Sequence, residues 1–159
     1  MRIAIDLHTQ QLALFDDADV LIRRYWCSTA LNGPGELNGS GCTPRGRHVV
    51  RARIGAGHAP TRAIFVGRRP TGNIWTPALT EEMPDKDWIL GRILWLSGCE
   101  PGRNRLGTVD SMRRYIYIHG TPDDQPMGVA RSHGCVRMRP DEIVELFDLV
   151  PAGTPVEIV

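Results

Sequence analysis

The sequence contains almost no lysine and no long hydrophobic run. Lys86 is the single lysine, so all the other basic side chains apart from histidine are arginines. The longest unbroken apolar runs, such as residues 63–66, are far shorter than the ~20 residues that a membrane-spanning helix needs. The sequence therefore predicts no membrane span and no membrane partner.

The chain also lacks an excess of charge of either sign. Its 19 basic and 18 acidic residues give a formal net charge of +1. A protein that binds nucleic acid through the phosphate backbone usually carries a clear basic excess. We therefore expect no nucleic-acid partner.

No secretory signal is visible at the N-terminus. Residues 1–6 enter an alternating pattern at once and reach Asp6, whereas a signal peptide has an apolar stretch of about 7–15 residues. This favours a cytoplasmic location, with the periplasm as the alternative if the N-terminus has been trimmed.

Paired metal-binding motifs are absent as well. None of the four cysteines forms a C-x-x-C pair, and no H-E-x-x-H motif occurs. The sequence predicts free thiols, no resident metal and no cofactor. We expect Cys27, Cys42 and Cys99 to be passive.

What the chain does contain is the pattern of a mainly β protein. Its 159 residues, 42% of them hydrophobic, suit a single domain over residues 1–159. Period-two alternation predicts strands near residues 3–7, 11–15, 20–27, 48–54, 64–67, 89–96, 114–119 and 155–159. Helical spacing of apolar residues occurs only after Pro140. We expect a β-sandwich or mixed sheet with one helix in the C-terminal region.

The chemistry is concentrated in two segments, Tyr117–Thr121 and Ser132–Met138. His119 ends a predicted strand, and Cys135 lies in a glycine-containing loop just ahead of the predicted helix. A cysteine needs a nearby base or positive charge to become a nucleophile, and His119 and the surrounding arginines can provide both. Gly134 leaves room for backbone N–H groups to face an oxyanion.

These residues resemble the catalytic domain of the L,D-transpeptidases, the YkuD-like family, whose motif is a strand-ending His followed by Ser-His-Gly-Cys. The resemblance extends upstream to residues 27–30, 43–46 and 113–121, so that it covers most of the chain. Many members carry Asn two residues after the catalytic cysteine, whereas this chain has Arg137.

The resemblance implies covalent acyl transfer on peptidoglycan tetrapeptide stems. Cys135 would attack the carbonyl of the L-centre diamino acid, and His119 would act as general acid and base, oriented by the carbonyl of Gly120. His133 would have a supporting role, and the N–H groups of Gly134 and Cys135 would bind the oxyanion. Candidate substrate-binding residues are Arg113, Arg114, Arg131, Ser132 and Arg137, although Ser132 also suits a loop-shaping hydroxyl.

The acyl acceptor decides the reaction that the resemblance implies. Water would give a murein tetrapeptide L,D-carboxypeptidase of cell-wall recycling, which we favour because no export signal is seen. An amine would instead give an L,D-transpeptidase that forms 3-3 crosslinks or exchanges terminal D-amino acids. Carbapenem-type β-lactams are expected to acylate Cys135 in either case.

Two other classes of function stay open at this stage. His119, His133 and Cys135 provide zinc-ligand types, but without the usual tight second pair. A non-catalytic module that only holds peptidoglycan fragments is the other alternative. The arginine pairs at 23–24 and 68–69 suit a solvated surface, and His8, His48 and His58 suit surface or packing positions. Residues 32–43 and 70–87 are candidate lids.

Overall fold

The computed structural model describes residues 1–57 and 59–159, so His58 lies outside the described residues. The strands are β1 (Arg2–Asp6), β2 (Gln11–Phe15), β3 (Leu21–Trp26), β4 (Gly46–Ile54), β5 (Ala63–Val66), β6 (Arg69–Ile74), β7 (Ile89–Gly98), β8 (Tyr117–Gly120), β9 (Val136–Met138) and β10 (Pro155–Ile158). The helices are α1 (Pro77–Glu82), α2 (Pro140–Leu149) and the 3-10 helix η1 (Gly107–Val109).

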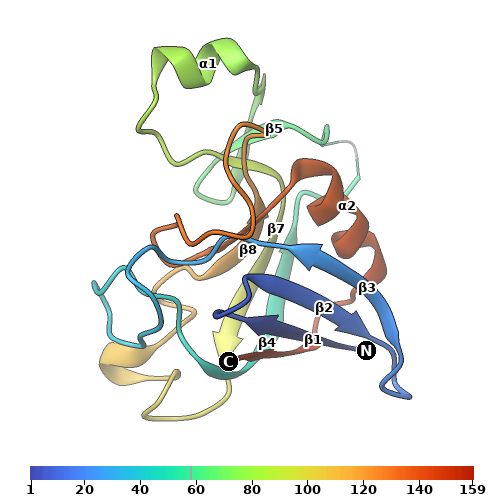
Figure 1. The fold of residues 1–159 in the computed structure, drawn as a ribbon, viewed down its shortest axis with the longest axis vertical. Coiled ribbons are helices and arrows are strands. Elements are labelled where there is room, and N and C mark those ends of the chain that lie inside the picture. The colour runs from blue at the N-terminus through green and yellow to red at the C-terminus, as the bar shows by residue number, and fades with distance from the viewer. Residues whose placement is uncertain (58) are drawn as a thin grey trace.

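The strands form one mixed sheet. Its main path runs β3-β2-β1-β10-β4-β7-β5-β6, and β8 branches from β7 to pair with β9. The β1–β10 and β8–β9 pairs are parallel and the others antiparallel. Figure 1 shows α2 lying against this sheet and α1 standing apart beyond β5. The prediction of a mainly β protein with a mixed sheet is confirmed.

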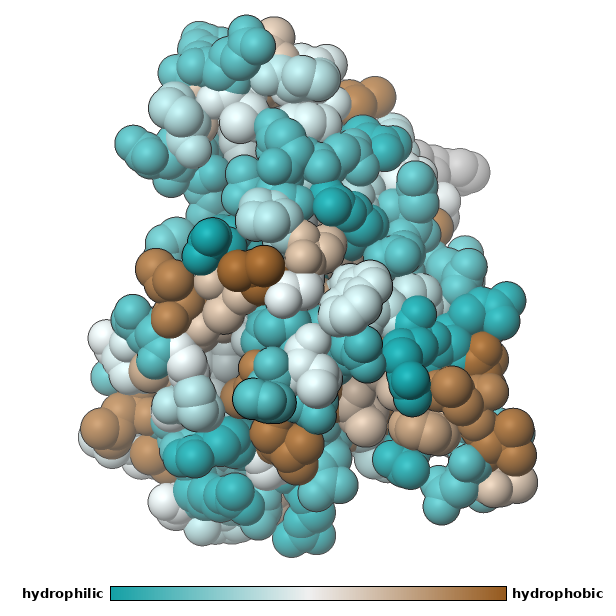
Figure 2. Space-filling model, in the orientation of Figure 1, coloured by the Kyte–Doolittle hydropathy of each residue, from teal (hydrophilic) through white to brown (hydrophobic). Residues whose placement is uncertain are grey.

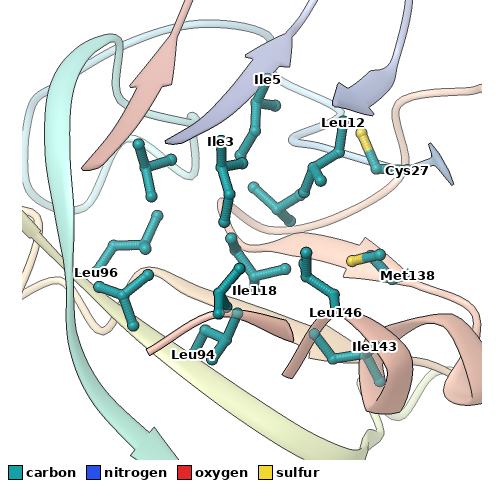
Figure 3. Packing of buried hydrophobic residues seen from close by; sticks show 14 of the residues in the cluster. Ile3, Ile5, Leu12, Cys27, Leu94, Leu96, Ile118, Met138, Ile143 and Leu146 are labelled. Atoms are coloured by element: carbon teal, nitrogen blue, oxygen red, sulfur yellow. The ribbon is translucent and has the colours of Figure 1, made fainter. Parts of the chain in front are cut away.

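The main core lies between the sheet and α2. Alternation in β1 buries Ile3 and Ile5, and they meet Leu94 and Ile118 from β7 and β8 in one cluster. Figure 3 shows these side chains converging with Leu146 from α2. Burying such side chains is the dominant favourable contribution to folding, so this cluster fixes the position of β8.

Helix α2 forms where the sequence predicts it. Pro140 occupies the start of the helix, where its missing N–H is not needed, and Asp141 and Glu142 lie in the first turn near the positive end of the helix dipole. Ile143 and Phe147 are buried on the face that packs against β7 and β8. The helix therefore covers the back of the strand that carries His119.

Several elements differ from the prediction. The six residues of β6 are all exposed and α1 buries none of its residues, so neither leaves a hydrophobic pattern in the sequence. The strand expected from residue 114 begins only at Tyr117, because Tyr115 adopts a positive φ of 57° in a turn. Cys135 is followed by β9, not directly by the helix. The helix expected in the C-terminal region is α2, and the structure adds the short helices α1 and η1.

The surface mixes polar and apolar side chains. Figure 2 shows hydrophobic residues in several separate small groups among hydrophilic ones on this face. Across the described residues, no helix has the length and apolar character to cross a membrane.

Candidate active site

The pairing of β8 with β9 brings the two motif segments side by side. In this parallel pair Ile118 lies opposite Val136, and His119 lies opposite Arg137. Ile118 and Val136 belong to the main core. Because neighbouring residues of a strand point to opposite faces, His119 and Arg137 face away from that core. Cys135, directly before β9, shares their face and packs with Tyr117 and Ile93 in a second, smaller cluster.

Cys135 is a half-buried thiol held between two backbone groups. Its S–H donates to the carbonyl of Tyr115 at 3.3 Å, and its Sγ accepts from the N–H of Tyr117 at 3.4 Å. Burial raises the pKa of Cys135 to about 12, although the Tyr117 N–H and the charges of Arg137 and Arg114 act in the opposite direction. The side chain therefore rests as a neutral thiol at neutral pH.

His119 is a buried imidazole with one nitrogen fixed. It is 1% exposed, and its Nδ1 lies 2.7 Å from the carbonyl oxygen of Gly120. A carbonyl can only accept a hydrogen bond, so in the neutral ring the proton belongs on Nδ1 and the Nε2 lone pair is free. Burial lowers the pKa of His119, while Asp87 and the Gly120 carbonyl oppose that shift. The imidazole is therefore neutral at neutral pH.

The loop before Cys135 is closed by its own hydrogen bonds. The Ser132 hydroxyl donates to the carbonyl of Cys135 at 2.6 Å and accepts from the N–H of Gly134 at 3.2 Å. Thr43 donates its hydroxyl proton to the carbonyl of Gly134 at 2.9 Å. The Cys135 N–H has no acceptor among the described residues. Of the two expected oxyanion donors, only the Cys135 N–H is therefore free in this structure.

Asp87 joins the site and was not predicted. Its Oδ1 lies 2.6 Å from Arg137 Nη2, and its Oδ2 lies 3.4 Å from Nδ1 of the exposed His133. Burial raises the pKa of Asp87, but the charges of His119 and Arg137 and hydrogen bonds from Arg137 and His133 outweigh it and leave the pKa below its usual range. The only hint in the sequence was that Asp87 ends the candidate lid at residues 70–87.

The predicted arginines do not form one cluster. Arg137 is 5% exposed and faces the site. Arg114 is half-buried and donates to the carbonyls of Gly35, Glu36 and Cys42, so it holds the loop that precedes Thr43. Arg113 and Arg131 are exposed. Among the described residues, neither of their side chains contacts the groups around Cys135.

Arg68 is a second residue near the site that sequence reasoning missed. It is exposed, as expected for an arginine in the 68–69 pair, but its guanidinium also makes specific contacts. It lies 4.4 Å from the centre of the Trp95 ring and 3.1 Å from the Tyr117 hydroxyl. Because Tyr117 packs in the same cluster as Cys135, Arg68 brings a positive charge to the Tyr117 side of the site.

A zinc site on His119, His133 and Cys135, the alternative considered above, would need these side chains to be grouped. Among residues 1–57 and 59–159, no three His, Cys, Asp or Glu side chains are grouped as metal ligands would be. The arrangement as a whole combines a thiol, a neutral imidazole with a free lone pair, an unpaired backbone N–H and an ion pair. These are the components of nucleophilic acyl transfer by a cysteine.

Comparison with known proteins points to the same chemistry. The family model of the L,D-transpeptidase catalytic domain (YkuD) matches residues 1–158. A putative L,D-transpeptidase from the ATP synthase subunits region of Fuscovulum blasticum is 35% identical over 96 residues, covering 58% of this chain and 46% of that protein.

Solved structures share the fold. L,D-transpeptidase 3 from Mycobacterium tuberculosis has a TM-score of 0.59 at 14% identity, with 99% of this chain and 60% of that chain covered. LD transpeptidase LdtMt1 in complex with imipenem has a TM-score of 0.56 at 17% identity, with 99% and 57% covered. The chain thus spans less than two thirds of the length of these relatives.

Proposed function

Because the chain belongs to the L,D-transpeptidase catalytic domain family, we propose that it transfers acyl groups from peptidoglycan tetrapeptide stems through a thioester on Cys135. The observation that carries the proposal is the contact between His119 Nδ1 and the Gly120 carbonyl. It leaves the Nε2 lone pair free on the face of the sheet that also carries Cys135.

The first half-reaction uses His119 as base and then as acid. The sulfur of Cys135 attacks the carbonyl carbon of the L-centre diamino acid while Nε2 takes the thiol proton. The C–N bond to the terminal D-Ala then breaks, and His119 returns the proton to the leaving amine. The products are free D-Ala and a thioester on Cys135.

Two features of the structure support this sequence of events. The pKa of Cys135 is raised to about 12 and that of His119 is lowered, so proton transfer accompanies the attack and no thiolate forms in advance. The sulfur is turned toward Tyr115 and Tyr117 at rest. The thiol proton therefore has to leave the Tyr115 carbonyl before His119 can take it.

The oxyanion is assigned to the backbone of Cys135. Its N–H lacks an acceptor in the described part of the chain, whereas the Gly134 N–H already donates to Ser132. A single preorganised donor of this kind contributes about 2.7–4 kcal/mol to transition-state stabilisation in related chemistry. Of the expected substrate-binding arginines, Arg137 is the one that faces the site, and we assign it, together with its ion-pair partner Asp87, to positioning a substrate carboxylate.

For the second half-reaction we propose water as the acceptor, as expected from the sequence. The product is then a tripeptide, and the activity is that of an L,D-carboxypeptidase of cell-wall recycling in the cytoplasm. An amine acceptor is the alternative and would give a crosslink or an exchanged terminal residue.

Mass spectrometry of the protein with a free murein tetrapeptide tests both half-reactions. We expect loss of D-Ala to give the tripeptide, with the same yield when a D-amino acid is present in excess. Exchange of the terminal residue would identify an amine-selective transpeptidase. No turnover by the wild type, in conditions where Cys135→Ala binds the peptide, would contradict the proposal.

β-Lactams provide an independent probe. The related LdtMt1 has been solved in complex with imipenem, a carbapenem. We propose that imipenem acylates Cys135 of this chain, because opening of the strained lactam places the new oxyanion where the peptide would. Intact mass should rise by one drug molecule in the wild type and in Cys99→Ala, and not in Cys135→Ala.

A further inference from the structure

A pocket of about 450 Å³ lies where helix α1 meets the hairpin of β5 and β6, in the part of the molecule beyond β5 in Figure 1. Ala63 and Phe65 of β5 pack in the same cluster as Cys135. Ile64, which lies between them, packs in a different cluster with Trp88, and both of these residues line the pocket. Because neighbouring residues of a strand point to opposite faces, the pocket and Cys135 lie on opposite faces of β5. The pocket is therefore separate from the active site and has no part in the proposed function.

The body of the pocket is apolar. Its hydrophobic lining, apart from Trp88, consists of the flexible side chains Ile64, Val66, Ile74, Leu79 and Met83. Val66 is 64% exposed and Ile74 is 53% exposed, because α1 lies beside them without burying any of its own residues. Packing within the chain thus leaves an apolar surface open to a ligand. The volume falls within the range of about 300–1,000 Å³ that is usual for pockets that bind small molecules.

One corner of the pocket offers hydrogen-bond donors and a positive charge. Trp88 is 5% exposed, and its Nε1–H has no acceptor among the described residues. The ammonium nitrogen of Lys86 lies 4.5 Å from the centre of the Trp88 ring and forms no ion pair within the described part of the chain. The Thr71 hydroxyl, also in the lining, already donates to the carbonyl of Ile64. A buried N–H without an acceptor is costly, so a ligand that supplies an acceptor here is favoured.

We propose that this pocket binds an aliphatic carboxylate, with its alkyl chain against the aliphatic side chains and its carboxylate against Lys86 and Trp88. The ammonium group and the indole N–H can only donate hydrogen bonds, and an ionised carboxylate can only accept them. Lys86 is also the one charged residue among those that line the pocket. Its hydrogen bond to a carboxylate is charge-assisted and therefore stronger than a neutral one.

An alkylammonium ion fits the pocket less well. Lys86 would repel it, and the Trp88 N–H would stay without an acceptor. Glu81, Glu82 and Asp85 make the neighbouring surface acidic, but all three are exposed and lie outside the lining. Distance and solvent therefore weaken their repulsion of a carboxylate in the pocket.

An NMR titration of 15N-labelled protein with octanoate tests the site. We expect octanoate to shift the indole N–H signal of Trp88, which is the signal missing from the spectrum of Trp88→Phe. Affinity should rise about fourfold with each CH₂ from butanoate to octanoate, because each buried CH₂ adds a similar increment of binding free energy. Octylammonium should bind about tenfold more weakly than octanoate, since it cannot accept a hydrogen bond.

Lys86→Met is the main variant, because it keeps an apolar side chain at an exposed position and removes the charge. Octanoate should bind about tenfold more weakly to this variant, and the preference over octylammonium should shrink accordingly. Arg69→Met is the matched control. Arg69 is an exposed basic residue of β6 outside the pocket, so its replacement should leave the affinity unchanged. Trp88→Phe keeps an aromatic ring without the N–H and should also weaken octanoate binding about tenfold.

Equal affinity for octanoate and octylammonium would overturn the assignment, as would equal losses in Lys86→Met and Arg69→Met. No shift of the Trp88 indole signal at any octanoate concentration would also overturn it. A shift of that signal with protein concentration alone would show that a second copy of the chain covers the pocket instead. Cys135→Ala should bind octanoate as the wild type does, so a failure of peptide turnover leaves this assignment intact.

Discussion

The carboxylate of Asp87 lies 2.6 Å from the guanidinium of Arg137, and this ion pair connects the segment before β7 to β9, the strand that follows Cys135. Arg137 is almost fully buried, so its charge depends on Asp87 for compensation. The pair therefore links the stability of the fold to the arrangement of the site.

Replacing Asp87 by asparagine should lower the free energy of unfolding by about 1–2 kcal/mol. Loss of one partner of a buried pair costs about 3–5 kcal/mol, but Asp87 keeps 35% of its side chain exposed, so solvent screens part of the interaction. Urea unfolding measures the change, with Asp85→Asn as the exposed control two residues away. An equal effect of Asp87→Asn in an Arg137→Met background would show that the two residues are not coupled.

The same ion pair predicts how stability depends on pH. The pKa of Asp87 is lower in the folded protein than its ordinary value of 3.8, so the folded state binds the proton less readily than the unfolded state does. The stabilisation is therefore fully present above about pH 5 and is lost as the pH falls through the folded pKa. At neutral pH, wild type and Asp87→Asn should differ in unfolding free energy by the amount given above. This difference should fall to about zero between pH 5 and pH 2.

The pH profile of kcat/KM should report His119. Its pKa lies below the ordinary value of 6.5, and the reaction requires the neutral imidazole. Activity should therefore be level around neutrality and fall only below pH 6.5. Asp87 raises the pKa of His119, so Asp87→Asn should move the acid limb to still lower pH. An acid limb above pH 7 would contradict the assignment of His119 as base.

Gly134→Ala should damage both the loop and the activity. Gly134 has a φ of +134°, and an added Cβ would lie 3.2 Å from the carbonyl oxygen of Cys42. We expect a loss of stability of about 1–3 kcal/mol and at least a hundredfold loss of kcat, because the Cys135 N–H would move. The control is Gly33→Ala. Gly33 also has a positive φ, but an added Cβ there has no atom within 4 Å, so this variant measures the cost of backbone strain without a displaced loop.

Cys135→Ser should lose nearly all turnover, because a serine hydroxyl is far harder to deprotonate than a thiol. His119→Ala should be comparably inactive, whereas Cys99→Ala, whose thiol is exposed and outside the site, should keep near wild-type rates. Single-turnover assays with the tetrapeptide distinguish these cases. Turnover by Cys135→Ser close to the wild-type rate would rule out the mechanism.

The strand pattern and α2 could be predicted because each buries one face. Alternation in β1 and helical spacing around Ile143 and Phe147 are direct consequences of burial. Hydrophobic periodicity could not predict α1 and β6, because neither element buries a face. It could not predict β9 either, because that strand has only three residues. Tyr115 breaks its predicted strand through a backbone angle that no side-chain pattern encodes.

The residues of the candidate site also differ in whether the sequence could reveal them. Cys135, His119 and Gly134 belong to a local motif and could be singled out from the sequence. Asp87 and Arg68 reach the site through long-range contacts, across 50 residues to Arg137 and 49 residues to Tyr117. Such contacts depend on how distant segments pack. Neither side chain has a local signal that separates it from an ordinary surface charge.

The hydrogen bond from the Cys135 thiol to the Tyr115 carbonyl has a consequence for reagents that seek out cysteines. Alkylating agents and peroxide react with thiolates, and this thiol is kept protonated. The exposed Cys99 should therefore be alkylated and oxidised before Cys135. Inhibitors of this protein should gain little from intrinsic electrophilicity and much from imitating the carbonyl group that Cys135 is proposed to attack.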